Sequence, residues 1–236
     1  MTTRRPPRHF GSRLRTALDG LAAAYGPQEW WPASDPFEMM AGALLTQRTT
    51  WRNAERAIAS LRRENVLSPE ALASVPVARL EALIRMAGTF RAKAARLKAL
   101  ARWYVDAGGR DALVVRRTAN LRLELLALRG IGPETADDIL VYVFARPVFV
   151  VDAYARRILS RYGCAQGDEP YEQLSDAVVR AIGADAARLG ELHALLVEHG
   201  KRYCRSTPRC EGCPLATECR TGRRLAGNET AVTAGR

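Results

Sequence analysis

The chain has 236 residues, 47% of them hydrophobic and 26% charged, which is typical of a globular protein with one or two domains and excludes a disulfide-dense mini-protein. Its 36 basic and 25 acidic residues give a formal net charge of +11, and this favours a polyanionic partner, nucleic acid before a membrane. An arginine-rich composition alone would produce the same charge, so the sequence motifs have to decide whether nucleic acid is the partner.

Apolar residues recur at three- and four-residue steps along most of the chain, and this spacing predicts an all-α fold. Asp35 and Ser68 are each followed by proline, which is typical of a capped helix start. The one strand-like run, residues 147–151, is short enough to be a buried connector. The periodic segments are residues 14–25, 37–45, 80–86, 90–104, 121–128, 139–144, 158–162 and 189–197.

The two ends of the chain lack this periodicity. Residues 1–10 are rich in arginine and proline, and residues 221–236 are polar, so both are expected to be disordered tails. The start also lacks the apolar core of a signal peptide, and no apolar run is long enough to span a bilayer. We therefore expect a cytoplasmic, nucleoid-associated protein in a reducing setting, where disulfides are rare.

A tight turn with two glycines lies between two helical patterns at residues 128–136. Gly130 and Gly132 allow another chain to approach the backbone closely, and the next helix starts at Pro133 with its positive end exposed, which together predict a phosphate-binding turn. Ile131 is expected to plug the turn between its helices. A helical hairpin can also carry glycine for packing alone.

Downstream of the hairpin, Asp152 follows the apolar run at the start of another helix. Taken alone, it is an ordinary N-cap. The arrangement LRGIGPETADDILVYVF followed by RPVFVVDAYARRIL, however, resembles the helix-hairpin-helix, Gly/Pro-rich loop and aspartate of the endonuclease III superfamily of DNA glycosylases. The resemblance runs from about residue 35 to Cys219. It implies a two-lobed fold, with residues 36–146 in one lobe, residues 11–35 and 147–220 in the other, and DNA across the cleft.

The resemblance also implies roles for two loops that enter the duplex. Gln47 matches the glutamine that fills the hole left by an extruded base, and Arg48 departs from the small or polar residue usual beside it. Relatives often carry a leucine at the position of Thr89, where it wedges into the duplex. In this chain Phe90 can act as the wedge instead. Lys93 follows in the same loop and is expected to contact DNA.

The bacterial 3-methyladenine glycosylase branch is the nearest resemblance, because Trp30-Trp31-Pro32 and LLTQ with Trp51 recur there. In that branch aromatic rings sandwich the flipped base, which makes Trp31 and Trp51 candidates for the base pocket. Tryptophan packed between helices is the alternative.

Four cysteines in one short stretch predict a metal site; they are Cys204, Cys210, Cys213 and Cys219. Only one C-x-x-C pair is present, which favours an iron–sulfur cluster over a zinc ribbon, with zinc as the alternative. The resemblance implies a [4Fe–4S] cluster, although the first gap is one residue shorter than usual in the family. Cys164 stands apart and is expected to be a buried small hydrophobe.

Basic residues accompany these cysteines. Lys201, Arg202 and Arg205 lie beside the first of them and are expected to bind the DNA backbone.

The chemistry implied by the resemblance rests on a carboxylate. Cleaving an N-glycosidic bond places positive charge on the sugar, which Asp152 would stabilise. Bifunctional relatives carry a lysine on the hairpin helix, and the matching residue here is Glu134, which cannot form a Schiff base. Glu134 could pair with Asp152 as acid and base, or simply complement its helix dipole.

The sequence thus favours a monomeric, monofunctional glycosylase that removes a damaged base from double-stranded DNA, alkylated purines before oxidised pyrimidines. A DNA-binding or damage-sensing protein with weak catalysis and a bifunctional glycosylase/lyase are the alternatives.

Overall fold

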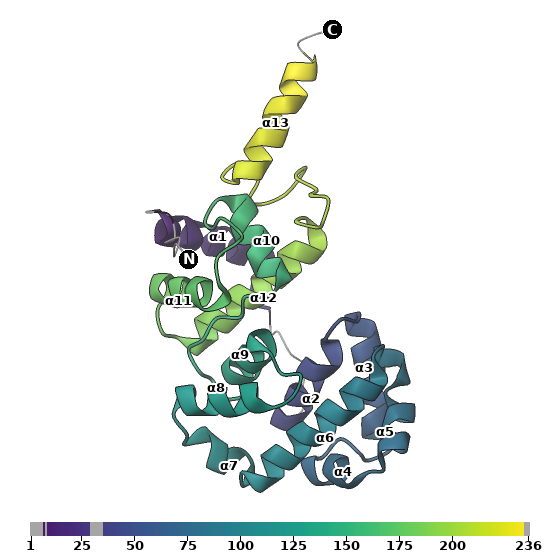
Figure 1. Cartoon of the computed structure of the whole chain (residues 1–236). Coiled ribbons are helices and arrows are strands. Elements are labelled where there is room, and N and C mark those ends of the chain that lie inside the picture. The colour runs from purple at the N-terminus through teal and green to yellow at the C-terminus, as the bar shows by residue number, and fades with distance from the viewer. Residues whose placement is uncertain (1–6, 8, 29–34, 234–236) are drawn as a thin grey trace. The chain divides into compact units, whose positions relative to one another are not determined.

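The computed structural model describes residues 7, 9–28 and 35–233, and every regular element in this part of the chain is a helix (Figure 1). The all-α prediction is therefore confirmed for the described residues. Trp31, a candidate for the base pocket, and residues 1–6 of the basic tail lie outside them. No helix among the described residues is long and apolar enough to cross a membrane.

The chain divides into two compact units, residues 1–30 with 147–236 and residues 31–146. The helices of the first are α1 (Phe10–Tyr25), α10 (Ala153–Tyr162), α11 (Tyr171–Ile182), α12 (Ala186–Arg202) and α13 (Arg220–Thr233). Those of the second are α2 (Pro36–Thr46), α3 (Trp51–Arg63), α4 (Pro69–Ser74), α5 (Val77–Leu83), the 3-10 helix η1 (Arg85–Ala87), α6 (Phe90–Asp106), α7 (Gly109–Val114), α8 (Thr118–Ala127) and α9 (Pro133–Tyr142).

Helix α2 lies at the centre of the second unit. The Asp35 carboxylate accepts hydrogen bonds from the backbone N–H groups of Phe37 and Glu38, so the predicted cap is confirmed. Every residue from Phe37 to Leu45 is buried, because α2 packs against α3, α6 and α9. A helix enclosed on all sides in this way fixes the position of the turn that follows it, residues 47–50.

The first unit is built around α12, which packs against α1, α10 and α11. Residues 147–151 form no strand and are largely buried, which confirms the predicted connector. Phe149 is fully buried, and its carbonyl accepts a hydrogen bond from Ser175. Cys164 is also fully buried as expected, and burial raises the pKa of its thiol to about 12.

Three features differ from the sequence predictions. Residues 221–233, expected to be an irregular tail, belong to α13, which directly follows Cys219. Helices α3, α7 and α11 lie outside the segments predicted from the sequence; in α3 and α11, alanines supply part of the buried face. Lys98, which the apolar spacing of residues 90–104 predicts on a solvated face, donates to the carbonyls of Ala73 and Val75 instead.

Candidate nucleic-acid interface and active site

The glycine hairpin is formed by α8, the turn 128–132 and α9. Gly130 has a φ of 89°, a left-handed conformation that glycine adopts without strain. Ile131 is 5% exposed, as expected for a plug, and its N–H donates to the carbonyl of Leu128 at 3.0 Å. At Gly132 the space where a Cβ would stand is open to 4 Å. The buried Ile131 side chain thus anchors the turn, while the backbone at Gly132 remains accessible from outside.

A buried ion pair joins the two helices of the hairpin. The Arg122 guanidinium donates to both carboxylate oxygens of Asp137 at 2.7 and 3.1 Å, and the Asp137 side chain is 2% exposed. The bidentate pair fixes the angle between α8 and α9. Glu134, in the first turn of α9, is exposed and lies where a carboxylate complements the helix dipole.

Gln47 is hydrogen-bonded into this hairpin. Its Nε2 donates to the Gly130 carbonyl at 3.1 Å and to Thr135 Oγ1 at 2.9 Å. Its Oε1 accepts from the Arg96 guanidinium at 2.7 Å. To enter a duplex, as the sequence predicts, the Gln47 side chain would have to give up all three bonds, so that role stays a prediction.

Arg48, the next residue, is exposed and has a φ of 52°. A side chain in the left-handed region costs roughly 1–2 kcal/mol, and such strain is concentrated at functional sites. Together with Gln47, Arg48 forms the turn that leaves α2.

The predicted wedge loop precedes α6. Gly88 has a φ of 87°, and Thr89 is exposed. Phe90 is half-buried, with the guanidinium carbons of Arg85 and Arg91 at 5.3 and 5.7 Å from its ring centre. An aromatic ring flanked by two cations is suited to the interface with a polyanion.

Lys93 lies inside the second unit, and the prediction that it contacts DNA does not fit its position. It is fully buried, and its amine donates to the carbonyls of Leu45 at 2.7 Å and Ala87 at 2.6 Å. Burial lowers its pKa from 10.5 to about 8. Lys93 therefore joins the end of α2 to η1, and so connects the turn at Gln47 with the wedge loop.

We expect Lys93→Met to destabilise the protein by roughly 2–3 kcal/mol, because two buried carbonyls lose their donor. The wild type should gain stability between pH 8 and 10.5, since its buried amine holds fewer protons than the unfolded amine over that range. Lys93→Met should lack this gain. Denaturant unfolding at several pH values measures both effects, and Arg102→Met, at an exposed position of the same helix, is the control. Equal stabilities of the two variants would contradict this assignment.

Of the two tryptophans proposed for a base pocket, Trp51 is described. It begins α3 and is 39% exposed, more than a core tryptophan would be. Its ring is therefore accessible to a stacking partner.

Asp152 caps α10 in the first unit. Its Oδ1 accepts a hydrogen bond from the Ala155 N–H at 2.6 Å, and its Oδ2 lies 3.7 Å from Nε2 of His193. The Asp152 side chain is 13% exposed and that of His193 6%. Phe149 meets the imidazole edge to face, with ring centres 6.5 Å apart. The carboxylate is thus held at one oxygen, while the other faces a buried imidazole.

His193 was not identified from the sequence, although a signal exists. The chain has three histidines, and two of them, His193 and His199, lie on α12 and are buried. Two buried imidazoles on one helix are uncommon in a core.

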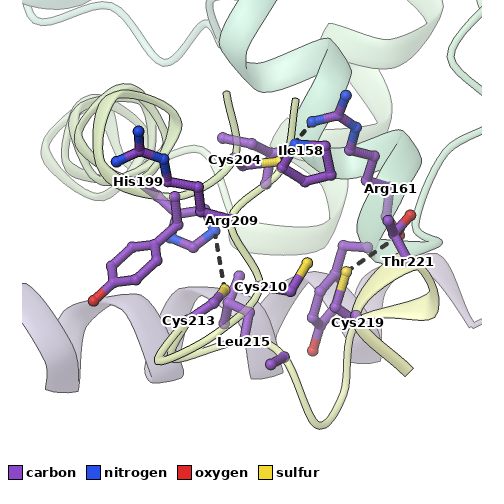
Figure 2. A pocket seen from close by; sticks show the side chains of 15 residues that line it. Ile158, Arg161, His199, Cys204, Arg209, Cys210, Cys213, Leu215, Cys219 and Thr221 are labelled. Atoms are coloured by element: carbon purple, nitrogen blue, oxygen red, sulfur yellow. Dashed lines mark hydrogen bonds between the residues drawn. The ribbon is translucent and has the colours of Figure 1, made fainter. Parts of the chain in front are cut away.

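All four predicted ligand cysteines line one pocket, together with apolar residues such as Ile158 and Leu215 (Figure 2). Among the described residues, however, no group of three or more His, Cys, Asp or Glu side chains is placed closely enough to hold a metal ion. Burial raises the pKa of the Cys213 thiol to about 11. The four cysteines thus line one pocket, but their described positions do not bring three or more ligand atoms close enough to bind a metal ion.

Polar groups contact the sulfurs of this pocket. The Arg161 guanidinium lies 3.6 Å from Cys204 Sγ, and the Arg161 carbonyl accepts from Cys219 Sγ at 3.3 Å. His199 Nε2 lies 3.8 Å from Cys213 Sγ, and burial lowers the pKa of this imidazole to about 4. The predicted phosphate contacts Lys201, Arg202 and Arg205 are all exposed.

A helical hairpin with an open glycine turn and a capping aspartate after a buried connector are together typical of base-excision repair proteins. Residues 41–182, more than half of the chain, match the HhH-GPD superfamily of base excision DNA repair proteins. The chain belongs to this superfamily.

Two relatives agree with this assignment. A Methanocaldococcus jannaschii protein, named provisionally as a DNA repair glycosylase, is 40% identical over 198 residues, which cover 83% of this chain and 90% of that protein. Endonuclease III of Thermotoga maritima is 32% identical over 197 residues, covering 83% and 88%.

Solved structures show the same fold. Endonuclease III in a non-covalent DNA complex superposes with a TM-score of 0.78 at 24% identity, covering 92% of this chain and 98% of that one. Helicobacter pylori 3-methyladenine DNA glycosylase bound to 1,N6-ethenoadenine gives 0.69 at 26% identity, covering 82% and 97%.

Proposed function

We propose that this protein is a monofunctional DNA glycosylase, which acts as a monomer on duplex DNA and hydrolyses the bond between a damaged base and its sugar. The observation that carries the proposal is Asp152, whose carboxylate is fixed at Oδ1 by the start of α10 and is partly exposed. A carboxylate in this state is ready to act without further reorganisation.

The chemistry assigned to Asp152 follows from its two oxygens. Because Oδ1 is engaged by the Ala155 N–H, we assign the contact with the reacting sugar to Oδ2, which also lies beside His193. Its negative charge stabilises the cation that develops as the base leaves, and it can accept a proton from the attacking water. Nε2 of His193 lies 3.7 Å from Oδ2, so a protonated His193 would offset part of the carboxylate charge.

The distribution of amines supports hydrolysis over a lyase reaction. Of the three lysines in the chain, Lys93 is buried on two carbonyls and Lys98 donates to two more. Lys201 is exposed beside the cysteine pocket, and the hairpin helix carries Glu134. A Schiff base needs an unprotonated amine at the sugar, and Lys93 and Lys98 are both held on backbone carbonyls instead.

We therefore expect base release from at least one lesion in a panel of duplexes, with no borohydride-trapped adduct on abasic DNA. Gel analysis after alkaline cleavage detects release, and a covalent band detects the lyase. Glu134→Lys, which supplies the amine, is the positive control for trapping. Tight binding without release on any lesion would favour the damage-sensing alternative. A wild-type adduct lost in Lys201→Ala would favour the bifunctional one.

Alkylated purines are the proposed substrate class, ahead of oxidised pyrimidines. The support is the exposed ring of Trp51 and the fold shared with a 3-methyladenine glycosylase that was solved with an alkylated adenine. A cationic or enlarged purine stacks well on an electron-rich indole.

We also propose that the cysteine pocket holds a [4Fe–4S] cluster, with zinc as the alternative. The support is chemical: four thiols, which are soft ligands, line one mostly apolar pocket. Cys204, Cys210, Cys213 and Cys219 would hold the cluster, which would stabilise the loop that carries the exposed basic residues.

A further inference from the structure

The cysteine pocket has a neighbour outside the cysteine loop. Tyr25, at the end of α1, and His199, on α12, are connected by a hydrogen bond between the Tyr25 hydroxyl and His199 Nδ1 at 2.8 Å. The other imidazole nitrogen, Nε2, lies 3.8 Å from Cys213 Sγ, within the range of a hydrogen bond to sulfur (Figure 2). One imidazole therefore connects a phenol of the N-terminal helix to a predicted metal ligand.

The position of this imidazole is tightly constrained. His199 is 2% exposed, and Tyr203 stacks on it with ring centres 5.9 Å apart and planes at 27°. The guanidinium carbon of Arg202 lies 5.0 Å from the centre of the Tyr25 ring and covers it from outside. A buried imidazole that is stacked on one face and hydrogen-bonded at Nδ1 cannot readily turn away, so its two nitrogens keep their present partners.

Two proton arrangements fit these distances. If Cys213 is a thiol, its S–H can donate to Nε2, and Nδ1–H can donate to the Tyr25 oxygen. If Cys213 binds a metal it is a thiolate, which has no proton and can only accept. Nε2 must then carry the hydrogen, so Nδ1 accepts from the Tyr25 hydroxyl.

We propose that Tyr25 and His199 belong to the metal site as a hydrogen-bonded pair, in which the Tyr25 hydroxyl fixes the tautomer of His199 and Nε2–H donates to the Cys213 sulfur. The inference rests on the cluster proposed above. The pair binds no metal itself: it positions Cys213 and withdraws charge from its sulfur. Such outer partners commonly change metal affinity by roughly 10–100-fold, and donors to cluster sulfurs raise the reduction potential.

The test uses the full-length, cluster-loaded protein and two readouts that do not depend on activity. The first is the rate at which a chelator bleaches the brown absorbance of the cluster, and the second is its reduction potential from a redox titration. His199→Phe, which keeps an aromatic ring and removes both nitrogens, should bleach roughly tenfold faster and shift the potential downward. His199→Gln retains a donor near Nε2 and should restore part of both properties.

A matched pair of tyrosine variants tests the tautomer argument. Tyr25→Phe and Tyr203→Phe each remove one hydroxyl from a ring beside His199, but the bond to Nδ1 belongs to Tyr25. Tyr25→Phe should bleach severalfold faster, and Tyr203→Phe should resemble the wild type. Circular dichroism verifies that each variant is folded.

The possible failures are distinguishable. Wild-type protein purified without iron or visible absorbance would overturn the cluster and this inference together. A loaded wild type with His199→Phe unchanged in both bleaching and potential would overturn the inference and leave the cluster standing. Equal effects of the two tyrosine variants would also overturn it, because packing alone would then explain them.

Discussion

Asp152→Asn is expected to lower the rate of base release by roughly 100-fold to 1000-fold, the loss seen when one electrostatic contributor is removed from an active site. The reason is specific to the carboxylate. Asparagine caps a helix about as well as aspartate, so the bond to the Ala155 N–H survives while the negative charge is lost. Single-turnover base release on the most reactive lesion measures the effect.

Its matched control is Asp185→Asn. Asp185 caps α12 through hydrogen bonds from the Ala187 and Arg188 N–H groups, and it is exposed. The two variants make the same chemical change at two helix starts, so only Asp152→Asn should lose activity, while the thermal midpoints of both stay near that of the wild type. Activity of Asp152→Asn within a fewfold of the wild type would remove Asp152 from the chemistry.

Gly132→Ala is expected to weaken binding to undamaged duplex DNA roughly tenfold, or about 1.4 kcal/mol, with little change in stability. The added methyl group meets no protein atom within 4 Å, and the φ of Gly132, −97°, suits alanine. Any loss of DNA affinity therefore reflects contact between the added methyl group and the bound duplex. Fluorescence anisotropy and thermal unfolding give the two quantities.

Gly130→Ala, two residues earlier, provides the contrast. There the φ is 89°, and a Cβ would stand 2.1 Å from Nε of Arg96, so the variant should lose stability as well as affinity. If Gly132→Ala binds DNA like the wild type, the glycines of the turn serve helix packing and the turn does not bind phosphate.

Local features of the fold were predictable from the sequence. The caps at Asp35 and Ser68 depend on bonds to residues two or three positions away, so a short motif specifies them. The connector 147–151 was predictable for a similar reason, as its apolar run is too short for a helix. Helix α3 was missed because its buried face includes Ala54 and Ala57, which give a weak apolar signal.

The site was predictable in its components but not in its contacts. The sequence identifies Gln47 and Lys93 as residues near DNA, yet their bonds run to Gly130, 83 positions from Gln47, and to Leu45, 48 positions from Lys93. Only the packing of α2 against α6 and α9 brings these groups together. A basic side chain on a polar helix gives no sign that it turns inward, so the sequence alone predicts Lys93 on the surface.

The ion pair between Arg122 and Asp137 has a thermodynamic consequence. Because it holds the two hairpin helices at a set angle before any ligand arrives, little backbone has to become ordered on association. The entropic penalty of ordering the hairpin on association with DNA is then small. A scaffold of this kind can sample many sites along a genome quickly, since each encounter requires no folding step.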